Sequence, residues 1–321
     1  MKKILAVLLV AVMLFFLLAC GGGEPAEIRI AGMKGPTTMG LVKLIDDSEK
    51  GLSKNTYHFS LKGKANEITP LLIKGELDMA ALPANVAATL YKNTNGAIEV
   101  LAINTLGVLN IVTKGVEINS FEDLKGKTIY ATGKGTTPEY AIRYLLTQNG
   151  INPDEDVTFE WKNEAAEIGT RFSTDAEIIA LLPQPYVTSV LVQNADAKIA
   201  LDLSNEWDAL ENGTSLVTGV LVVRKDFAEK NPQAVADFLA EYEASVAYCN
   251  ENLDGAAKLI VNMGILGAEP VAKRAIPNCH VTFIKGEAMK TKLKGYLGTL
   301  YEQDPASIGG AMPGDDFYYT K

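Results

Sequence analysis

Two short threonine-bearing segments of the sequence are suited to binding an anion. The first contains Gly35, Pro36, Thr37 and Thr38 between an apolar run and a helical pattern, and Thr136-Thr137 stands in a similar position further on. Backbone N–H groups at the start of a helix are unpaired and carry partial positive charge, so they attract negative groups. If these two helix starts face each other, they form a site for a carboxylate, sulfonate or phosphate.

A lysine stands just before the second of these segments. Lys134 lies between Gly133 and Gly135. Its ammonium group either adds a point charge to the site or, as is commoner in a glycine-flanked loop, is simply solvated. The segment is not a phosphate-binding P-loop, because Thr128 occupies the position of the first glycine and Gly135 stands where serine or threonine must follow the lysine.

Five more candidate ligand-binding residues follow other strand-like runs. Asn85 and Thr105 offer hydrogen-bonding groups, and each is also a residue type used for local caps and turns. Tyr186 offers either a stacking surface for a ligand or packing between domains. Asn163 and Gln184 occupy corresponding strand ends.

The residues needed for catalysis or metal binding are scarce. His58 and His280 are the only histidines, and after Cys20 only Cys249 and Cys279 remain. These two cysteines can pair or stay as buried free thiols. No spacing typical of a metal site occurs, and no Ser-His-Asp set, paired-carboxylate motif or cofactor fingerprint is found. We therefore expect no catalytic residue, no metal and no cofactor.

The elements that position the candidates form two similar series. Short apolar runs alternate with helical periods, which predicts an α/β fold with largely parallel sheets. In the first series Thr37 is expected to cap a helix whose apolar face begins at Leu41. Strands are expected at 28–31, 57–61, 78–82 and 100–104, then at 128–131, 157–161 and 178–182, with a helix at 138–148.

Two further β-rich runs divide the chain into two lobes. The runs 108–112 and 216–223 are predicted to lead from one lobe to the other and to act as a hinge. Lobe 1 is expected to comprise residues 27–113 and 219–321, and lobe 2 is the inserted segment 114–218. The cleft between two hinged lobes is the natural ligand site.

The N-terminus has the pattern of an export signal. Two lysines precede an apolar run at 4–18, which is shorter than the about 20 residues of a spanning helix. Leu17-Leu18-Ala19-Cys20 resembles the lipobox of bacterial lipoprotein precursors. The resemblance implies a signal peptide at 1–19, a lipidated Cys20 and a flexible tether through residue 26. The mature protein is then extracytoplasmic and anchored to the cell membrane by lipid alone.

The charge of the chain is strongly acidic. The sequence holds 30 Lys and Arg against 39 Asp and Glu, a formal net charge of −9. Removing the signal peptide takes away two lysines and no acid, which makes the mature chain more acidic still. A nucleic acid is therefore not expected as a partner.

Three segments carry a resemblance to a known family. They are Lys74-Gly75-Glu76-Leu77-Asp78-Met79-Ala80-Ala81-Leu82-Pro83, Ser120-Phe121-Glu122-Asp123-Leu124-Lys125-Gly126-Lys127-Thr128-Ile129 and Gly133-Lys134-Gly135-Thr136-Thr137-Pro138. In this order they resemble the type 2 periplasmic-binding-protein fold, specifically the ABC-importer solute-binding lipoproteins of the nitrate/sulfonate/taurine and thiamine-precursor-like group. Ser120 and Asp123 also fit a capping box before a surface helix.

The resemblance implies a monomeric, non-enzymatic receptor. It would capture a small anionic, or aromatic and heterocyclic, molecule in the interlobe cleft and deliver it to an ABC permease with its ATPase. Amino-acid-like ligands also stay open, because no pair of fixed charges in the sequence selects among these classes. The alternatives are an enzyme of the thiamine-pyrimidine or menaquinone-pathway type, or a sensory or adhesive surface lipoprotein.

Overall fold

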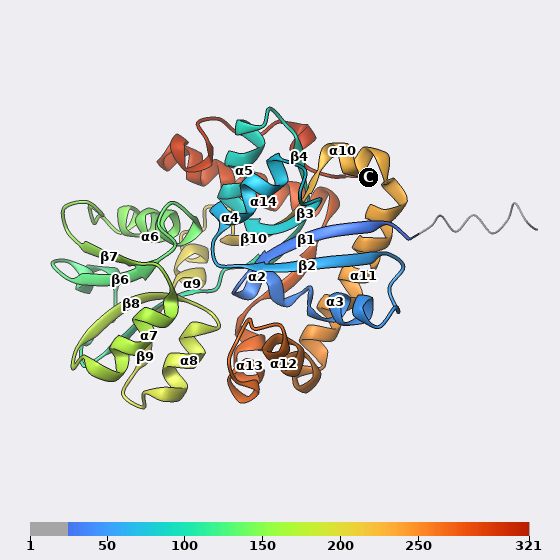
Figure 1. Cartoon of the computed structure of the whole chain (residues 1–321). Helices are drawn as coiled ribbons and strands as arrows, with labels where there is room; N and C mark the ends of the chain where they lie inside the picture. Colours follow the sequence, from blue (N-terminus) through green and yellow to red (C-terminus); the bar gives the residue numbers. More distant parts are fainter. Residues whose placement is uncertain (1–24, 321) are drawn as a thin grey trace, which may run out of the picture.

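The computed structural model describes residues 25–320, which form two α/β lobes, each around its own sheet (Figure 1). The expected signal peptide at 1–19, Cys20 and the tether up to residue 24 lie outside the described residues. Within residues 25–320, no helix combines the length and the apolar character needed to cross a bilayer.

Lobe 1 is built on a six-stranded sheet in the order β11-β4-β10-β3-β1-β2. β1 is parallel to β2 and β3, whereas β10 runs antiparallel to its neighbours β3 and β4. The carboxyl ends of β1 to β4 therefore lie on one edge, which faces lobe 2. The strands are β1 (Glu27–Met33), β2 (Thr56–Lys62), β3 (Met79–Pro83), β4 (Ile98–Leu106), β10 (Val217–Arg224) and β11 (Val281–Ile284).

Lobe 2 is built on a five-stranded sheet in the order β7-β6-β8-β5-β9. β6 is parallel to β7 and β8 in the same arrangement as β1 with β2 and β3, so the similarity of the two series is confirmed. The strands are β5 (Leu109–Lys114), β6 (Thr128–Thr132), β7 (Thr158–Lys162), β8 (Ile178–Pro183) and β9 (Lys198–Asp202).

The first crossing between the lobes lies earlier than the expected boundary at 113. The backbone of β5 pairs with β8 and β9, so β5 belongs to the sheet of lobe 2. Gly107 and Val108, between β4 and β5, therefore form this crossing. The second crossing is the segment between β9 and β10.

Helices cover both faces of each sheet. Their apolar stripes explain their positions: α11, for example, buries Val235, Phe238, Leu239 and Tyr242 at helical spacing. In lobe 1 the helices are α2 (Pro36–Met39), α3 (Val42–Glu49), α4 (Ala65–Ile73), α5 (Ala84–Asn93), α10 (Lys225–Lys230), α11 (Pro232–Glu251), α12 (Leu253–Asn262), α13 (Glu269–Ala275) and α14 (Gly286–Gln303). In lobe 2 they are α6 (Thr137–Gln148), α7 (Ala165–Thr174), α8 (Tyr186–Gln193) and α9 (Leu203–Asp208).

The first helix starts two residues earlier than predicted. Thr37 is not the N-cap, because α2 begins at Pro36 and Gly35 precedes it with a φ of 149°. Proline suits the first helical position, where its missing N–H is not needed. The chain then turns at Gly40, where an added Cβ would lie 2.4 Å from Tyr242 Oη, before α3 continues. The single predicted helix is thus broken into α2 and α3 at Gly40, where the chain packs closely against Tyr242 of α11.

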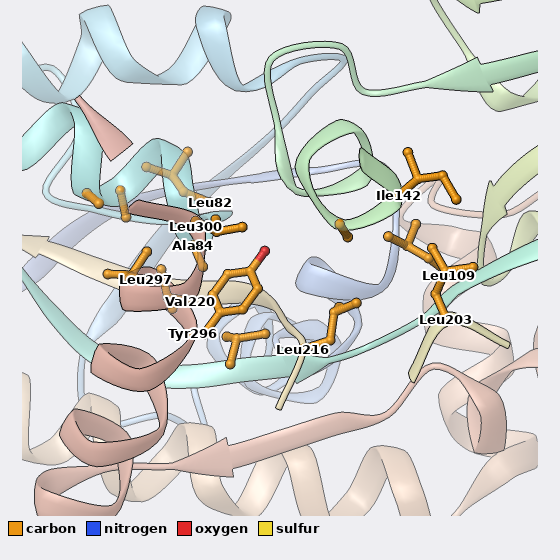
Figure 2. Packing of buried hydrophobic residues seen from close by; sticks show 14 of the residues in the cluster. Leu82, Ala84, Leu109, Ile142, Leu203, Leu216, Val220, Tyr296, Leu297 and Leu300 are labelled. Carbon is orange, nitrogen blue, oxygen red and sulfur yellow. The ribbon is translucent and has the colours of Figure 1, made fainter. Parts of the chain in front are cut away.

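One apolar cluster continues from lobe 1 into lobe 2. Leu82, Val220 and Tyr296 of lobe 1 belong to the same cluster as Leu203 and Ile142 of lobe 2, and the close view shows them around the crossing strands (Figure 2). The two lobes are therefore joined by apolar packing on the side of α6, α9 and α14.

Candidate functional site

The two predicted helix starts meet at the strand that returns from lobe 2. Thr137 Oγ1 of lobe 2 donates to the carbonyl of Thr218 at 3.5 Å. A Cβ placed on the next residue, Gly219, would lie 2.4 Å from Thr37 Cγ2 of lobe 1. Thr37 is 4% exposed and Thr137 is 0% exposed. Two threonines from separate lobes therefore flank residues 218 and 219.

The end of β4 adds an amide and a hydroxyl beside this contact. Asn104 donates through Nδ2 to the carbonyl of Thr37 at 3.1 Å. The backbone of Thr105 pairs with Gly219 across the sheet. We call the six residues gathered here the junction site: they are Thr37, Asn85, Asn104, Thr105, Thr137 and Thr218.

Asn85 connects this site directly to lobe 2. Its Nδ2 donates to the carbonyl of Gly135 at 3.3 Å and to that of Ser307 at 3.2 Å. Asn85 follows β3 at the start of α5, whereas Gly135 belongs to the loop before α6. One side chain thus spans the boundary between the lobes.

Four buried side-chain atoms of the junction site have no protein partner within residues 25–320. They are Asn85 Oδ1, Asn104 Oδ1, Thr105 Oγ1 and Thr218 Oγ1. A buried polar group without a hydrogen bond costs about 1–3 kcal/mol, so such groups are rare in folded proteins. Their clustering between two lobes indicates a place where a polar ligand supplies the missing bonds.

The aromatic ring of Tyr296 closes one side of the junction site. Its hydroxyl lies against Thr137, and burial raises the pKa of this hydroxyl well above its ordinary value. Tyr296 therefore stays neutral at every physiological pH. The six junction-site residues are likewise uncharged, so the polar interactions this site offers are hydrogen bonds and the dipole of a helix end.

Other predicted residues lie beside the site with their groups already engaged. The hydroxyl of Thr38 donates to the carbonyl of Met33 at 2.6 Å, and that of Thr136 donates to the carbonyl of Gly133 at 2.6 Å. Gly35 and Pro36 form the start of α2. Lys134 is exposed and forms no ion pair with any described residue.

Asn163 lies at the rim, where the ends of β2 and β7 approach each other. Its Oδ1 accepts a hydrogen bond from Lys64 Nζ at 2.9 Å, and both residues are exposed. The contact joins lobe 1 to lobe 2 at the opposite end of the sheets from the crossings.

Removing this rim contact should loosen the lobes slightly. We expect Lys64→Ala to speed the release of a bound solute about threefold without lowering the melting temperature, because an exposed polar pair contributes little to stability. Stopped-flow dissociation kinetics measure the rate. Lys64 directly precedes α4, and Lys74, which is also exposed, directly follows it. Lys74→Ala is therefore the matched control and should leave the release rate unchanged.

Gln184 and Tyr186 occupy the other side of lobe 2, at the start of α8. Gln184 Oε1 accepts bonds from the N–H and hydroxyl of Thr188, at 3.2 and 2.8 Å. Tyr186 is half-buried, and burial, with a smaller contribution from the charge of Glu164, raises the pKa of its hydroxyl. No hydrogen bond among the described residues connects either of them to the junction site.

Sequence reasoning missed Asn104, Thr218 and Tyr296. A signal for Thr218 was present, because it interrupts an apolar run of β-branched residues just before Gly219. Asn104 stands next to the predicted Thr105. Tyr296 had no such signal, since it lies in the apolar stripe of α14.

The structure leaves both described cysteines as thiols. Cys249 and Cys279 are buried and unbonded, and burial raises the pKa of Cys249 to about 12. In the part of the chain that the structure describes, no three His, Cys, Asp or Glu side chains gather as metal ligands would.

Solved structures with the same fold cover nearly all of the chain. An ABC transporter from Parabacteroides distasonis is 22% identical, with 92% of this chain and 99% of that chain covered and a TM-score of 0.76. The alkanesulfonate-binding protein SsuA from Xanthomonas axonopodis pv. citri, bound to MOPS, is 14% identical, with 91% and 96% covered and a TM-score of 0.70. The periplasmic nitrate-binding protein NrtA from Synechocystis PCC 6803 is 13% identical, with 88% and 82% covered and a TM-score of 0.62.

These likenesses confirm the predicted two-lobed fold and its resemblance to the solute-binding proteins of ABC importers. No curated protein matches the sequence. The family described as NMT1/THI5 like matches residues 62–256, which is more than half of the chain. The protein therefore belongs to the NMT1/THI5-like family.

Proposed function

We propose that the protein is an extracytoplasmic solute-binding lipoprotein that captures a small polar solute in the junction site and delivers it to an ABC permease with its ATPase. The observation that carries this proposal is the set of buried, unpartnered polar atoms contributed by segments that meet between the two lobes. The fold supports it, since the structural neighbours named above are described as an ABC transporter, an alkanesulfonate-binding protein and a nitrate-binding protein.

The ligand that suits this site carries an anionic group and at least one donor. At the start of α6 Pro138 has no N–H, and the N–H of Glu139 donates to the carbonyl of Thr136. The N–H of Thr137 and the positive end of the helix dipole are therefore what this helix offers an anionic group. The oxygens of Asn85 and Asn104 accept hydrogen bonds from an N–H or O–H of the same solute. A solute that touches both lobes binds the closed conformation, in which the lobes are in contact, more tightly than an open one. Binding therefore shifts the protein toward the closed conformation.

A lipid on Cys20 would keep this receptor at the membrane. A tethered receptor has a raised effective concentration at its permease. We propose that the protein acts as a monomer with two moving parts, which are lobe 1 and the inserted lobe 2. Because β5 belongs to the sheet of lobe 2, we place the first boundary at Gly107 and Val108 rather than at residue 113.

A ligand screen tests the proposal. The chain is heated in the presence of sulfonates, carboxylates, pyrimidines and amino acids, and the melting temperature is recorded. The right solute at about 100 times its Kd should stabilise the protein by about 2.7 kcal/mol. Mass spectrometry should then recover the solute unchanged. A chemically converted product, or no stabilisation by any class, contradicts the proposed role.

A further inference from the structure

A cavity lies beside the crossing, between α8 of lobe 2 and α13 of lobe 1. Its volume is about 190 Å³, and its lining includes Gly107 and Val108 of the crossing itself. This is below the about 300–1,000 Å³ of pockets that hold drug-sized ligands, so the cavity suits a small molecule. None of the six junction-site residues lines it. The cavity is therefore a separate place where one molecule can touch both lobes.

Opposite charges reach this cavity from opposite lobes. Arg274 comes from α13 and forms no ion pair with any residue between 25 and 320. Asp202 ends β9, and its Oδ1 accepts the N–H groups of Ser204 at 2.8 Å and Asn205 at 3.3 Å. These bonds fix the carboxylate in place, and no residue from 25 to 320 donates to Oδ2. One free guanidinium group and one oriented carboxylate thus line the same small space.

Buried polar side chains complete the wall on the lobe 2 side. Gln184 and Asn110 are each 4% exposed and line the cavity. Because Thr188 occupies Gln184 Oε1, the Gln184 NH₂ group is left to donate, and it donates to no described residue. On the lobe 1 side, His280 Nδ1 lies 2.5 Å from the carbonyl of Gly107. This contact connects the lobe 1 wall of the cavity to the crossing segment.

We propose that this cavity is a second solute site, and that it binds a small zwitterion such as an amino acid. The carboxylate of the zwitterion pairs with Arg274 and its ammonium group pairs with Asp202. A plain anion would face the carboxylate of Asp202, and a plain cation would face Arg274, so each leaves one charge unmatched. The bound zwitterion bridges the lobes and thereby raises the affinity of the junction site for its solute. By linkage, the junction-site solute raises the affinity of this cavity for the zwitterion by the same factor.

Calorimetric titration of the full chain with four probes tests the charge pattern. L-Alanine and β-alanine carry both charges at different spacings, propionate carries only the carboxylate, and ethylamine carries only the ammonium group. We expect at least one of the two amino acids to bind at least tenfold more tightly than propionate and ethylamine. Equal binding by propionate, or no binding by either amino acid, overturns the proposal.

Two variants locate the binding event. Arg274→Gln and Asp202→Asn should each weaken amino-acid binding at least tenfold, and asparagine keeps the cap of α9 intact. Lys273→Gln, which changes the neighbouring cation that pairs with Asp254, should have no effect. Unaltered binding in both variants places the amino acid elsewhere and overturns the second site.

The outcomes also separate this inference from the proposed function. If the amino acids fail to bind while a solute from the screen still stabilises the chain, the second site is wrong and the proposed function stands. If an amino acid binds through Arg274 and Asp202 while no solute binds at the junction site, the second site stands and the proposed function of the junction site is wrong.

Discussion

Thr137→Arg should lower the affinity for the junction-site solute about 100-fold or more, which corresponds to about 2.7 kcal/mol. Thr137 is fully buried between Thr218 and Tyr296. No space for a guanidinium group exists there, and burying an unpaired charge is costly. We expect the arginine to hold the lobes apart, because the residue lies where they touch. Calorimetry of the solute and small-angle scattering measure the two effects.

A second arginine on the same helix controls for the added charge. Thr147 is exposed near the other end of α6. Thr147→Arg should keep the solute affinity and the scattering profile of the unmodified protein. Far-ultraviolet circular dichroism of Thr137→Arg should remain that of a folded chain. An affinity within threefold of normal in a folded Thr137→Arg protein would remove Thr137 from the site.

Gly219→Ala should weaken both folding and solute binding. The new methyl group would lie 2.4 Å from Thr37 Cγ2 and 2.6 Å from Asn104 Oδ1, so both side chains must shift. Overpacking of this kind costs about 1–3 kcal/mol. Because the two displaced residues belong to the junction site, the solute affinity should fall as well. Denaturant unfolding gives the first quantity and calorimetry gives the second.

A glycine-to-alanine substitution at another position should have the opposite effect on the stability of the protein. Gly298 lies in the middle of α14, and nothing lies within 4 Å of an added Cβ. Gly298→Ala should stabilise the protein by about 0.5–1 kcal/mol, since alanine favours the helix. It should leave the solute affinity unchanged. A Gly219→Ala protein with normal stability and affinity would show that β10 is not packed against Thr37 in solution.

The alternating series of strands and helices could be predicted because each buried strand has a recognisable local sequence pattern. β3 and β8 are short apolar runs followed by a helical period, and their burial is nearly complete. β9 and β11 were missed. Both are edge strands with partly exposed residues, and each pairs with a strand far away in the sequence. Edge strands lack the continuous apolar pattern that marks a central strand.

The candidate site was predictable only where it follows strand ends of a parallel sheet. Thr37, Asn85 and Thr137 each stand just after such a strand, so their nearness follows from the topology. Thr218 joins them through the antiparallel register of β10, which no local pattern encodes. That Asp202 and Arg274 line the same cavity is similarly a product of tertiary structure. Without it, the sequence offered no fixed charges to select a ligand.

The position of β10 also sets the order in which the protein can fold. β10 lies between β3 and β4, so the edge of each of these two strands that faces β10 has no partner until residue 224 has been made. All five strands of the other sheet are complete by Asp202. At about 5–20 residues per second, roughly 6–24 s separate the synthesis of β4 from that of β10. The inserted lobe can therefore form first, while β3 and β4 each keep one unpaired edge that a chaperone or a translocation machine can hold.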